Sequence, residues 1–149
     1  MEIKKILWAT DFSENASRAL PYVSSLSEQY QTDVHVLYVI EDLAYHDPWY
    51  GEFDKTHIEK IHEWERKKAN KRLNEICDKY LKGCPLFTKH VAVGDPAKEI
   101  LRFAQSENVD MIVMATRGRS GDFPFGSVTE KVLKNSPIPV VAVPIVDKT

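Results

Sequence analysis

Cysteine is scarce in this sequence, with two among 149 residues, at positions 77 and 84. Cys77 and Cys84 are too few and too far apart to indicate a zinc site, a redox motif or a disulfide framework. Disulfides are in any case uncommon in the reducing cytosol. We therefore expect two reduced thiols in a cytoplasmic protein.

Long apolar runs are also missing, and none approaches the ~18 residues that a membrane-spanning helix needs. The chain starts Met1-Glu-Ile-Lys-Lys and leads directly into an apolar segment. This start differs from a secretory signal, which has a longer hydrophobic region and a cleavage site of small residues. We expect no removed leader and no membrane partner.

The sequence has no excess of charge of either sign. Lys and Arg number 20 against 22 Asp and Glu, for a formal net charge of −2. Nucleic-acid-binding domains are usually basic, so we expect no nucleic acid partner. The 43% hydrophobic and 28% charged residues are ordinary for a globular protein. We expect a single domain over residues 1–149, large enough for its own core.

Apolar runs alternate with amphipathic segments along the chain. Strands are predicted at 3–9, 34–40, 86–93, 109–115 and 138–146. Helices are predicted from the 10–14 segment to about 30, at about 56–81, at 97–106 and at 127–135. The strands lack the polar alternation of a half-exposed sheet. This order predicts an α/β fold, a doubly wound five-stranded parallel sheet with helices on both faces.

Polar residues mark the starts of three helices. Asp11 has an acidic residue three positions later, and Ser127 is followed at the same spacing by Glu130, which is the pattern of a capping box. Asp95 followed by Pro96 predicts an N-cap and a first helical residue. A cap therefore explains Asp11 and Ser127 without any ligand, and contact with a ligand is the alternative for each.

Residues 111–130 combine a buried strand, a loop with three glycines and the start of a helix. Backbone N–H groups in such an arrangement can face an anion. In a doubly wound sheet, ligands bind beyond the carboxyl ends of the strands, where the winding reverses. With the order 3-2-1-4-5, this point brings Thr10 and Asp11 beside 115–118, with Val39 on the neighbouring strand.

Six short segments, spread over almost the whole chain, form one pattern: Thr10-Asp11-Phe12-Ser13, Tyr38-Val39-Ile40, Gly94-Asp95-Pro96, Arg117-Gly-Arg-Ser-Gly, Gly126-Ser127-Val-Thr-Glu and Pro137-Ile-Pro-Val-Val. With these segments the chain resembles the universal stress protein family. The resemblance implies an adenine nucleotide alpha hydrolase-like fold with the sheet order 3-2-1-4-5, in a cytoplasmic homodimer formed through the last strand. One branch of this family binds ATP. Another branch lacks nucleotide and acts as a stress-linked regulator or binding module.

The family pattern, carried over by position, implies a set of cofactor-binding residues. Asp11 would meet the ribose or metal side, the backbone of Val39 would meet adenine, and Met114 would line the base and sugar. The full set is Thr10, Asp11, Val39, Met114, Ala115, Arg117, Gly118, Gly126, Ser127 and Val128. The last helix start and the glycines before it would hold phosphate.

The sequence departs from the ATP-binding pattern Gly-x2-Gly-x9-Gly-Ser/Thr in two places. Ala115 replaces the first glycine, and seven residues, 119–125, separate Gly118 from Gly126. The shortening removes up to about 7 Å of reach, and Asp122 adds a negative charge to the loop. We expect binding of ATP, ADP or AMP, with or without Mg²⁺, and of a mono- or diphosphate in preference to a triphosphate.

Catalysis is not indicated, because the glycine loop lacks the lysine of a Walker motif and the spacing of a hydrolase elbow. At most, slow ATP hydrolysis is expected. A nucleotide-free dimeric regulatory protein of the same fold is the alternative function, and an enzyme acting on a small phosphorylated compound is a third. The aromatic segment 41–55 fits no regular element and is expected either to cover the crevice or to form a partner site.

Overall fold

The computed structural model describes residues 1–41, 55–80, 87–117 and 126–145. The strands in these ranges are β1 (Lys5–Thr10), β2 (Asp33–Glu41), β3 (Phe87–Gly94), β4 (Met111–Ala115) and β5 (Val140–Val143). The helices are α1 (Glu14–Ser17), α2 (Leu20–Tyr30), α3 (Lys55–Tyr80), α4 (Pro96–Ser106) and α5 (Ser127–Asn135). The predicted alternation of strands and helices is confirmed, and α5 has the predicted bounds.

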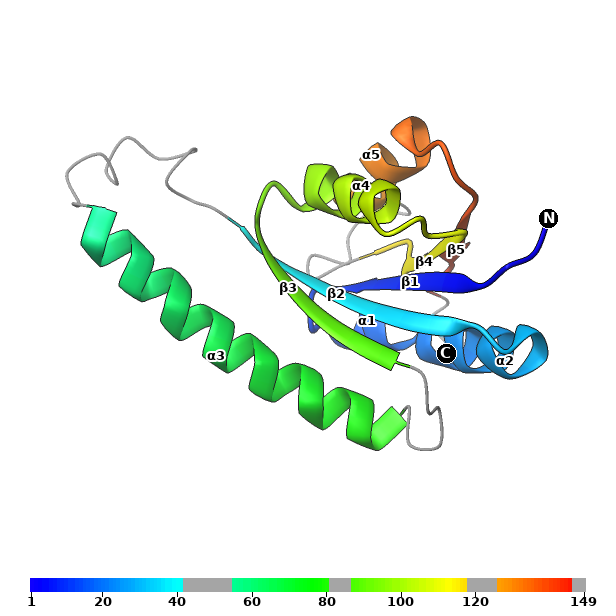
Figure 1. The fold of residues 1–149 in the computed structure, drawn as a ribbon, viewed down its shortest axis with the longest axis horizontal. Helices are drawn as coiled ribbons and strands as arrows, with labels where there is room; N and C mark the ends of the chain where they lie inside the picture. Colours follow the sequence, from blue (N-terminus) through cyan, green and yellow to red (C-terminus); the bar gives the residue numbers. More distant parts are fainter. Residues whose placement is uncertain (42–54, 81–86, 118–125, 146–149) are drawn as a thin grey trace.

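The strands form one parallel sheet in the order β3-β2-β1-β4-β5, as predicted. The chain moves outward from β1 to β3 and then returns to place β4 on the other side of β1 (Figure 1). The winding therefore reverses between β1 and β4. A ligand site is expected beyond the carboxyl ends of these two strands.

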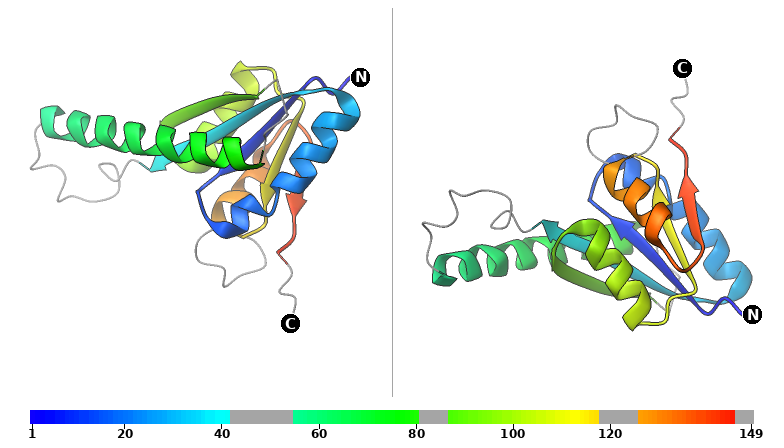
Figure 2. Two further views of the ribbon diagram at one scale, coloured as in Figure 1. Left: turned by 90° about the horizontal axis from the view of Figure 1, so that it is seen from below. Right: turned by 90° about the horizontal axis from the view of Figure 1, so that it is seen from above.

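Alternate residues of β1 point into two separate cores, because successive strand side chains face opposite sides of a sheet. Ile6 and Trp8 pack with Leu20 of α2 and Leu73 of α3. Leu7 belongs instead to the cluster formed with α4 and α5. Figure 2 shows the corresponding layers, with α4 and α5 on one face and α1, α2 and α3 on the other. The strands are thus buried on both sides, which explains their continuous apolar runs.

The predicted helix after β1 is wrong in its start and its continuity. The N-cap is Ser13 and not Asp11, since the Ser13 hydroxyl accepts a hydrogen bond from the Ala16 N–H at 3.1 Å. The segment then divides into α1 and α2, with Pro21 in the first turn of α2. Proline has no N–H to continue the hydrogen bonding of the preceding helix, which accounts for the break.

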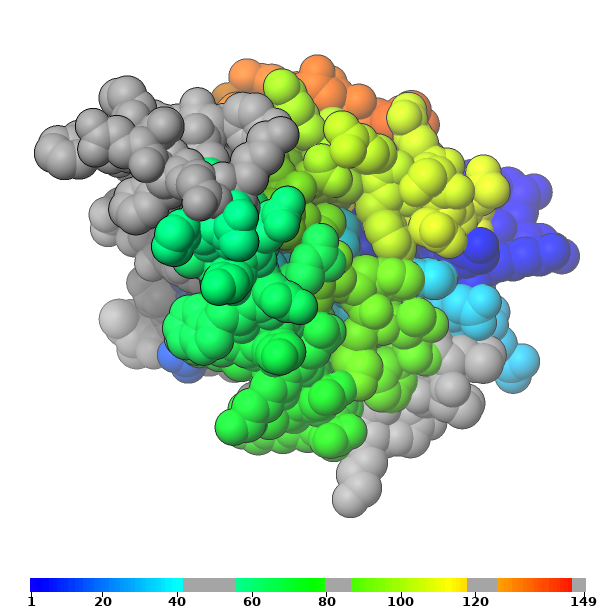
Figure 3. Space-filling view, turned by 60° about the vertical axis from the view of Figure 1, so that its left-hand side comes forward, coloured from blue at the N-terminus to red at the C-terminus, as the bar shows by residue number. Residues whose placement is uncertain are grey.

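Helix α3 packs on the sheet through only part of its length. Ala69 and Leu73 are buried, whereas Ile61 is 44% exposed. The N-terminal half of α3 extends past the ends of the described strands (Figure 1). Its C-terminal half crosses one face of the molecule beside β3 (Figure 3). None of the helices in the described ranges has the length and apolar character needed to cross a membrane.

Candidate functional site

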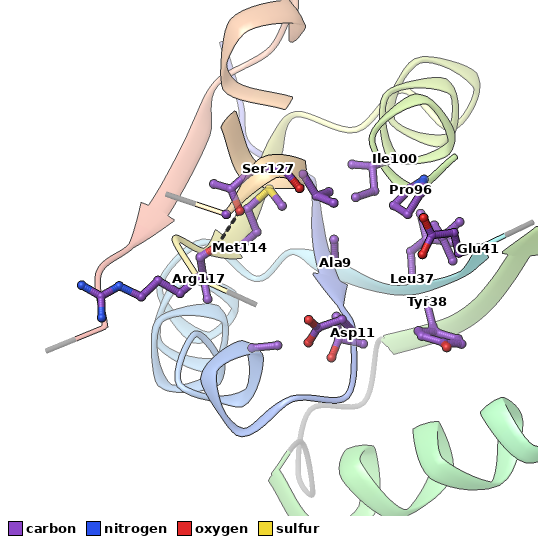
Figure 4. A pocket seen from close by; sticks show the side chains of 17 residues that line it. Ala9, Asp11, Leu37, Tyr38, Glu41, Pro96, Ile100, Met114, Arg117 and Ser127 are labelled. Atoms are coloured by element: carbon purple, nitrogen blue, oxygen red, sulfur yellow. Dashed lines mark hydrogen bonds between the residues drawn. The ribbon is translucent and has the colours of Figure 1, made fainter. Parts of the chain in front are cut away.

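A cavity of about 350 Å³ opens at the carboxyl ends of β1, β2 and β4, between the starts of α4 and α5 (Figure 4). Nine of the ten predicted site residues line it, namely Thr10, Asp11, Val39, Met114, Ala115, Arg117, Gly126, Ser127 and Val128. The tenth, Gly118, lies outside the described residues. The position agrees with the reversal of winding between β1 and β4.

The floor of the cavity is apolar. Ala9, Leu37, Met114 and Ala115 are buried residues from three neighbouring strands, and Ile100 of α4 closes the same side. Figure 4 shows the Ile100 side chain across the cavity from Met114, with Ala9 between them. An apolar floor flanked by a few polar groups is the usual composition of a small-molecule site.

Asp11 lies at the edge of this floor, in the turn between β1 and α1. One carboxylate oxygen, Oδ1, accepts a hydrogen bond from the Ser13 N–H at 2.9 Å. The intervening residue, Phe12, has a φ of 65°, and its N–H donates to Thr10 Oγ1 at 3.1 Å. Asp11 therefore shapes the turn, and it does so from a position on the cavity lining.

Helix α5 begins at the cavity without a side-chain cap. Its N-cap is Gly126, and Ser127 is the first helical residue, so the predicted capping box is wrong. Glu130 instead accepts a hydrogen bond from Lys134 Nζ at 2.8 Å, which lowers the pKa of Glu130. Glycine has no side chain to accept from the N–H groups of the first turn. No side chain among the described residues caps these N–H groups, so they and the positive end of the helix dipole lie at the cavity wall.

Two hydrogen bonds hold the start of α5 against β4. The Thr129 hydroxyl donates to the Ala115 carbonyl at 2.8 Å, and both groups are buried. The Gly126 N–H donates to the carbonyl of Thr116. These bonds fix the first turn of α5 relative to the apolar floor, so the two parts of the cavity have a defined relative position.

Arg117 lines the cavity at the end of β4. In Figure 4 its side chain extends away from the centre of the cavity, so its guanidinium is not directed at the floor.

Sequence reasoning missed several lining residues, including Leu37, Pro96 and Ile100. Their apolar side chains have the same pattern as ordinary core positions, so no motif distinguishes them. Leu37 could have been found from Val39, since residues two apart on a strand share a face. Pro96 and Ile100 depend on how closely α4 approaches β2, which the sequence pattern does not give.

The other resolved pKa shifts among the described residues belong to groups that do not line the cavity. His35 Nδ1 and His90 Nε2 are 3.0 Å apart, and burial lowers the pKa of both rings. Burial also raises the pKa of the Cys77 thiol to about 11. No three His, Cys, Asp or Glu side chains within the described ranges gather closely enough to hold a metal ion.

Comparison with known proteins agrees with the fold and the topology. The sequence profile of the Universal stress protein family matches residues 2–144. The chain belongs to the universal stress protein family. A relative, universal stress protein MJ0577 of Methanocaldococcus jannaschii, is 33% identical over 152 residues, which cover 94% of this chain and 94% of the relative.

Solved structures of the family have the same architecture. The structure of MJ0577 superimposes with a TM-score of 0.86 at 28% identity, covering 99% of this chain and 100% of that chain. A universal stress protein from Archaeoglobus fulgidus in complex with dAMP has a TM-score of 0.66 at 22% identity, covering 96% and 99%. The crystal structure of a universal stress protein in complex with cAMP has a TM-score of 0.66 at 16% identity, covering 96% of this chain and 98% of that chain. The predicted adenine nucleotide alpha hydrolase-like fold is confirmed.

Proposed function

We propose that this universal stress protein binds an adenine nucleotide in the cavity between β1, β2, β4 and the starts of α4 and α5. The observation that carries the proposal is the glycine-capped start of α5, which lines the same cavity as Asp11 and the apolar floor. These three parts match the three parts of a nucleotide. Its ring prefers an apolar surface, its ribose hydroxyls can donate to a carboxylate, and its phosphate favours a helix N-terminus.

In this proposal the base lies between Leu37 and Ile100, with the Val39 backbone beside it. The ribose lies at Asp11, and the phosphate lies at Gly126 and Ser127. The cavity volume of about 350 Å³ is within the range of small-molecule sites. Met114 and Ala115 separate the base end from the phosphate end along β4.

A mono- or diphosphate is the proposed ligand in preference to ATP. The 119–125 segment is short for a loop that wraps a triphosphate, and Asp122 adds a like charge. Further support comes from the dAMP and cAMP complexes of two family structures, since both ligands are monophosphates. The protein would act as a stress-response binding module with at most slow ATP hydrolysis. Its cytoplasmic location stays a prediction.

Titration calorimetry of AMP, ADP and ATP tests the proposal, with Mg²⁺ or with EDTA, on protein freed of any co-purified nucleotide. We expect micromolar binding of AMP. Asp11→Ala should weaken it by about tenfold or more, because a carboxylate that accepts from the ribose is lost. Asp33→Ala is the matched control, since Asp33 lies at the opposite end of β2 from the cavity. Absence of heat with all three nucleotides would contradict the proposal.

We also infer a homodimer that pairs through β5. This strand is at the edge of the sheet, and its sequence Val-Val-Ala-Val is apolar. An apolar edge strand is a template for pairing with another chain unless it is covered. Two copies related by a two-fold axis would cover each other's edge.

The backbone of β5 offers a specific test of this pairing. The carbonyls of Pro139 and Val143 accept from the N–H groups of Ile112 and Thr116, so the alternating groups at Ala142 face the open edge. Ala142→Pro removes the outward N–H and keeps the ladder to β4. We expect this variant to sediment as a monomer and the unmodified chain as a dimer. If the unmodified chain sediments as a monomer, the inferred homodimer is contradicted.

A further inference from the structure

A second hollow of about 490 Å³ adjoins the nucleotide cavity. Asp11 and Tyr38 line both of them, so the two are neighbours across the turn that follows β1. The other wall of the second hollow is α3, which runs below Asp11 and Tyr38 in Figure 4. A group attached to a ligand at Asp11 would therefore extend toward α3.

Two cations on α3 line this hollow, one helical turn apart. Lys68 Nζ lies 5.1 Å from the centre of the Trp64 ring, and Arg72 Cζ lies 5.1 Å from the centre of the Phe12 ring. A cation over an aromatic face is attracted by the ring, so each of these flexible side chains has a preferred position. The hollow thus has two oriented positive groups.

The ring under Arg72 is itself held in place. Phe12 packs against Tyr38 with ring centres 4.2 Å apart. Its φ of 65° lies in the left-handed region, which a bulky side chain rarely adopts. Such strain persists only where the surroundings maintain it. The turn therefore fixes the ring between Tyr38 of β2 and Arg72 of α3.

Asp11 and Glu65 also line the hollow, so its charges are balanced and not uniformly positive. Asp11 lies on the border with the nucleotide cavity and is oriented by the Ser13 N–H. Lys68 and Arg72 lie on the far side, on α3, together with Glu65, so the two cations outnumber the acidic side chain on that wall. An anionic group would consequently be drawn across the hollow toward the helix, away from the carboxylate that faces the ribose.

Resting on the proposed function, we propose that this hollow binds a second phosphate, carried by the ribose 2′ or 3′ hydroxyl of the bound nucleotide. The ligand class is an adenosine bisphosphate, with one phosphate at α5 and the other between Lys68 and Arg72. The ribose lies at the border that the two hollows share, so its hydroxyls are the points of attachment. Guanidinium and ammonium groups are the usual partners of such a phosphate.

Calorimetry with 5′-AMP, adenosine 3′,5′-bisphosphate and adenosine 2′,5′-bisphosphate tests this assignment. We expect at least one bisphosphate to bind about tenfold more tightly than AMP. In Lys68→Gln/Arg72→Gln, the bisphosphates should bind no more tightly than AMP, and the AMP affinity should be unchanged. Glutamine keeps much of each aliphatic stem, which limits loss of packing.

Lys67→Gln/Lys71→Gln is the matched control. It removes the same charge at the same spacing from the same helix, at exposed residues that do not line the hollow. It should retain the preference for bisphosphate, and equal loss of that preference in both double variants would overturn the assignment.

If the unmodified protein binds AMP but prefers neither bisphosphate, this inference fails and the proposed function stands. If AMP itself does not bind, both fail. Circular dichroism confirms that each variant folds.

Discussion

Helices α4 and α5 both begin at the rim of the same cavity, but their first turns are satisfied in different ways. At α4, the Asp95 carboxylate accepts a hydrogen bond from the Lys98 N–H at 3.1 Å, and Pro96 follows at the first position. At α5, the cap is Gly126, which has no side chain to offer. At α4 the cap takes up the Lys98 N–H and Pro96 has no N–H to satisfy, whereas no side chain of the described residues caps the first turn of α5, so its N–H groups can bind another acceptor.

This difference separates a structural helix start from a ligand-binding one. A side-chain cap neutralises the first turn and contributes to stability whether or not a ligand is present. A first turn without such a cap gains most when an anion approaches, because the N–H groups and the dipole are both available. Of the two helices that begin at the cavity, α5 is therefore the one to which we assign the proposed phosphate.

The largest expected effect comes from giving α5 the kind of cap that α4 has. Gly126 has φ −68° and ψ 152°, a conformation that any residue can adopt. In Gly126→Asp, the new carboxylate should accept from the first turn and repel phosphate. We expect calorimetry to show that AMP affinity falls by about 100-fold. We expect urea unfolding to show that the free energy of unfolding rises by a few tenths of a kcal/mol.

Gly126→Ser separates the charge of the new cap from its hydrogen bond. Serine also caps a helix, but it adds no negative charge, so AMP affinity should fall less than in Gly126→Asp. Unchanged AMP affinity in the aspartate variant would mean that phosphate does not lie at α5.

The next largest effect concerns how α5 is held in place. Thr129→Val keeps the shape of the side chain but removes the hydroxyl that donates to the buried Ala115 carbonyl. Leaving a buried acceptor without its partner costs about 1–3 kcal/mol. We expect a loss of this size in urea unfolding, together with weaker AMP binding, because the first turn of α5 is no longer fixed to β4. Thr129→Ser, which keeps the hydroxyl, should lose less.

A smaller effect is expected at α4. Asp95→Ala removes the carboxylate that accepts from Lys98 and should lower the free energy of unfolding by about 1 kcal/mol, with AMP affinity unchanged. Ser127→Ala is the informative companion in the same denaturation experiment. If Ser127 were a cap, it would cost as much as Asp95→Ala; as an exposed first helical residue, it should cost less than about 0.5 kcal/mol.

The two helix starts also explain what the sequence could and could not predict. Asp95-Pro96 was assigned correctly because proline restricts the cap to the residue before it. Ser127 and Glu130 have the spacing of a capping box, yet the helix is capped one residue earlier and Glu130 binds Lys134. Spacing alone cannot separate these arrangements. The same applies to Asp11, where the left-handed Phe12 moves the cap to Ser13.

Topology was predictable because each strand is buried on both faces and so has a continuous apolar run. The same burial limits prediction of the cavity. Leu37 and Ile100 line the cavity with side chains typical of the core, and only their positions distinguish them. The hollow beside α3 was not predicted, since it depends on Lys68 and Arg72 lying opposite the turn after β1. Contacts between distant segments of this kind carry no local signal.

The smallest expected effect is a dependence of local stability on pH, which should be larger in α4 than in α5. His35 and His90 share a hydrogen bond of 3.0 Å, and the His90 ring lies 4.6 Å from the ring of Phe103 on α4. One imidazole must donate and the other accept, so the pair persists only while at least one ring is neutral. The charged groups that act on the pair are Lys5, Asp33 and Glu107.

Burial lowers the pKa of both rings below the ordinary value of 6.5. As the pH falls through 6.5, the unfolded chain binds protons that the folded chain does not, so the free energy of unfolding should decrease until the lowered pKa values are reached. Amide exchange at about pH 7.5 and about pH 5.5 should then show α4 losing more protection than α5. His35→Gln/His90→Gln should remove the difference, and His57→Gln/His62→Gln, on α3, should retain it. Equal loss of protection in both helices would mean that the histidine pair does not act through α4.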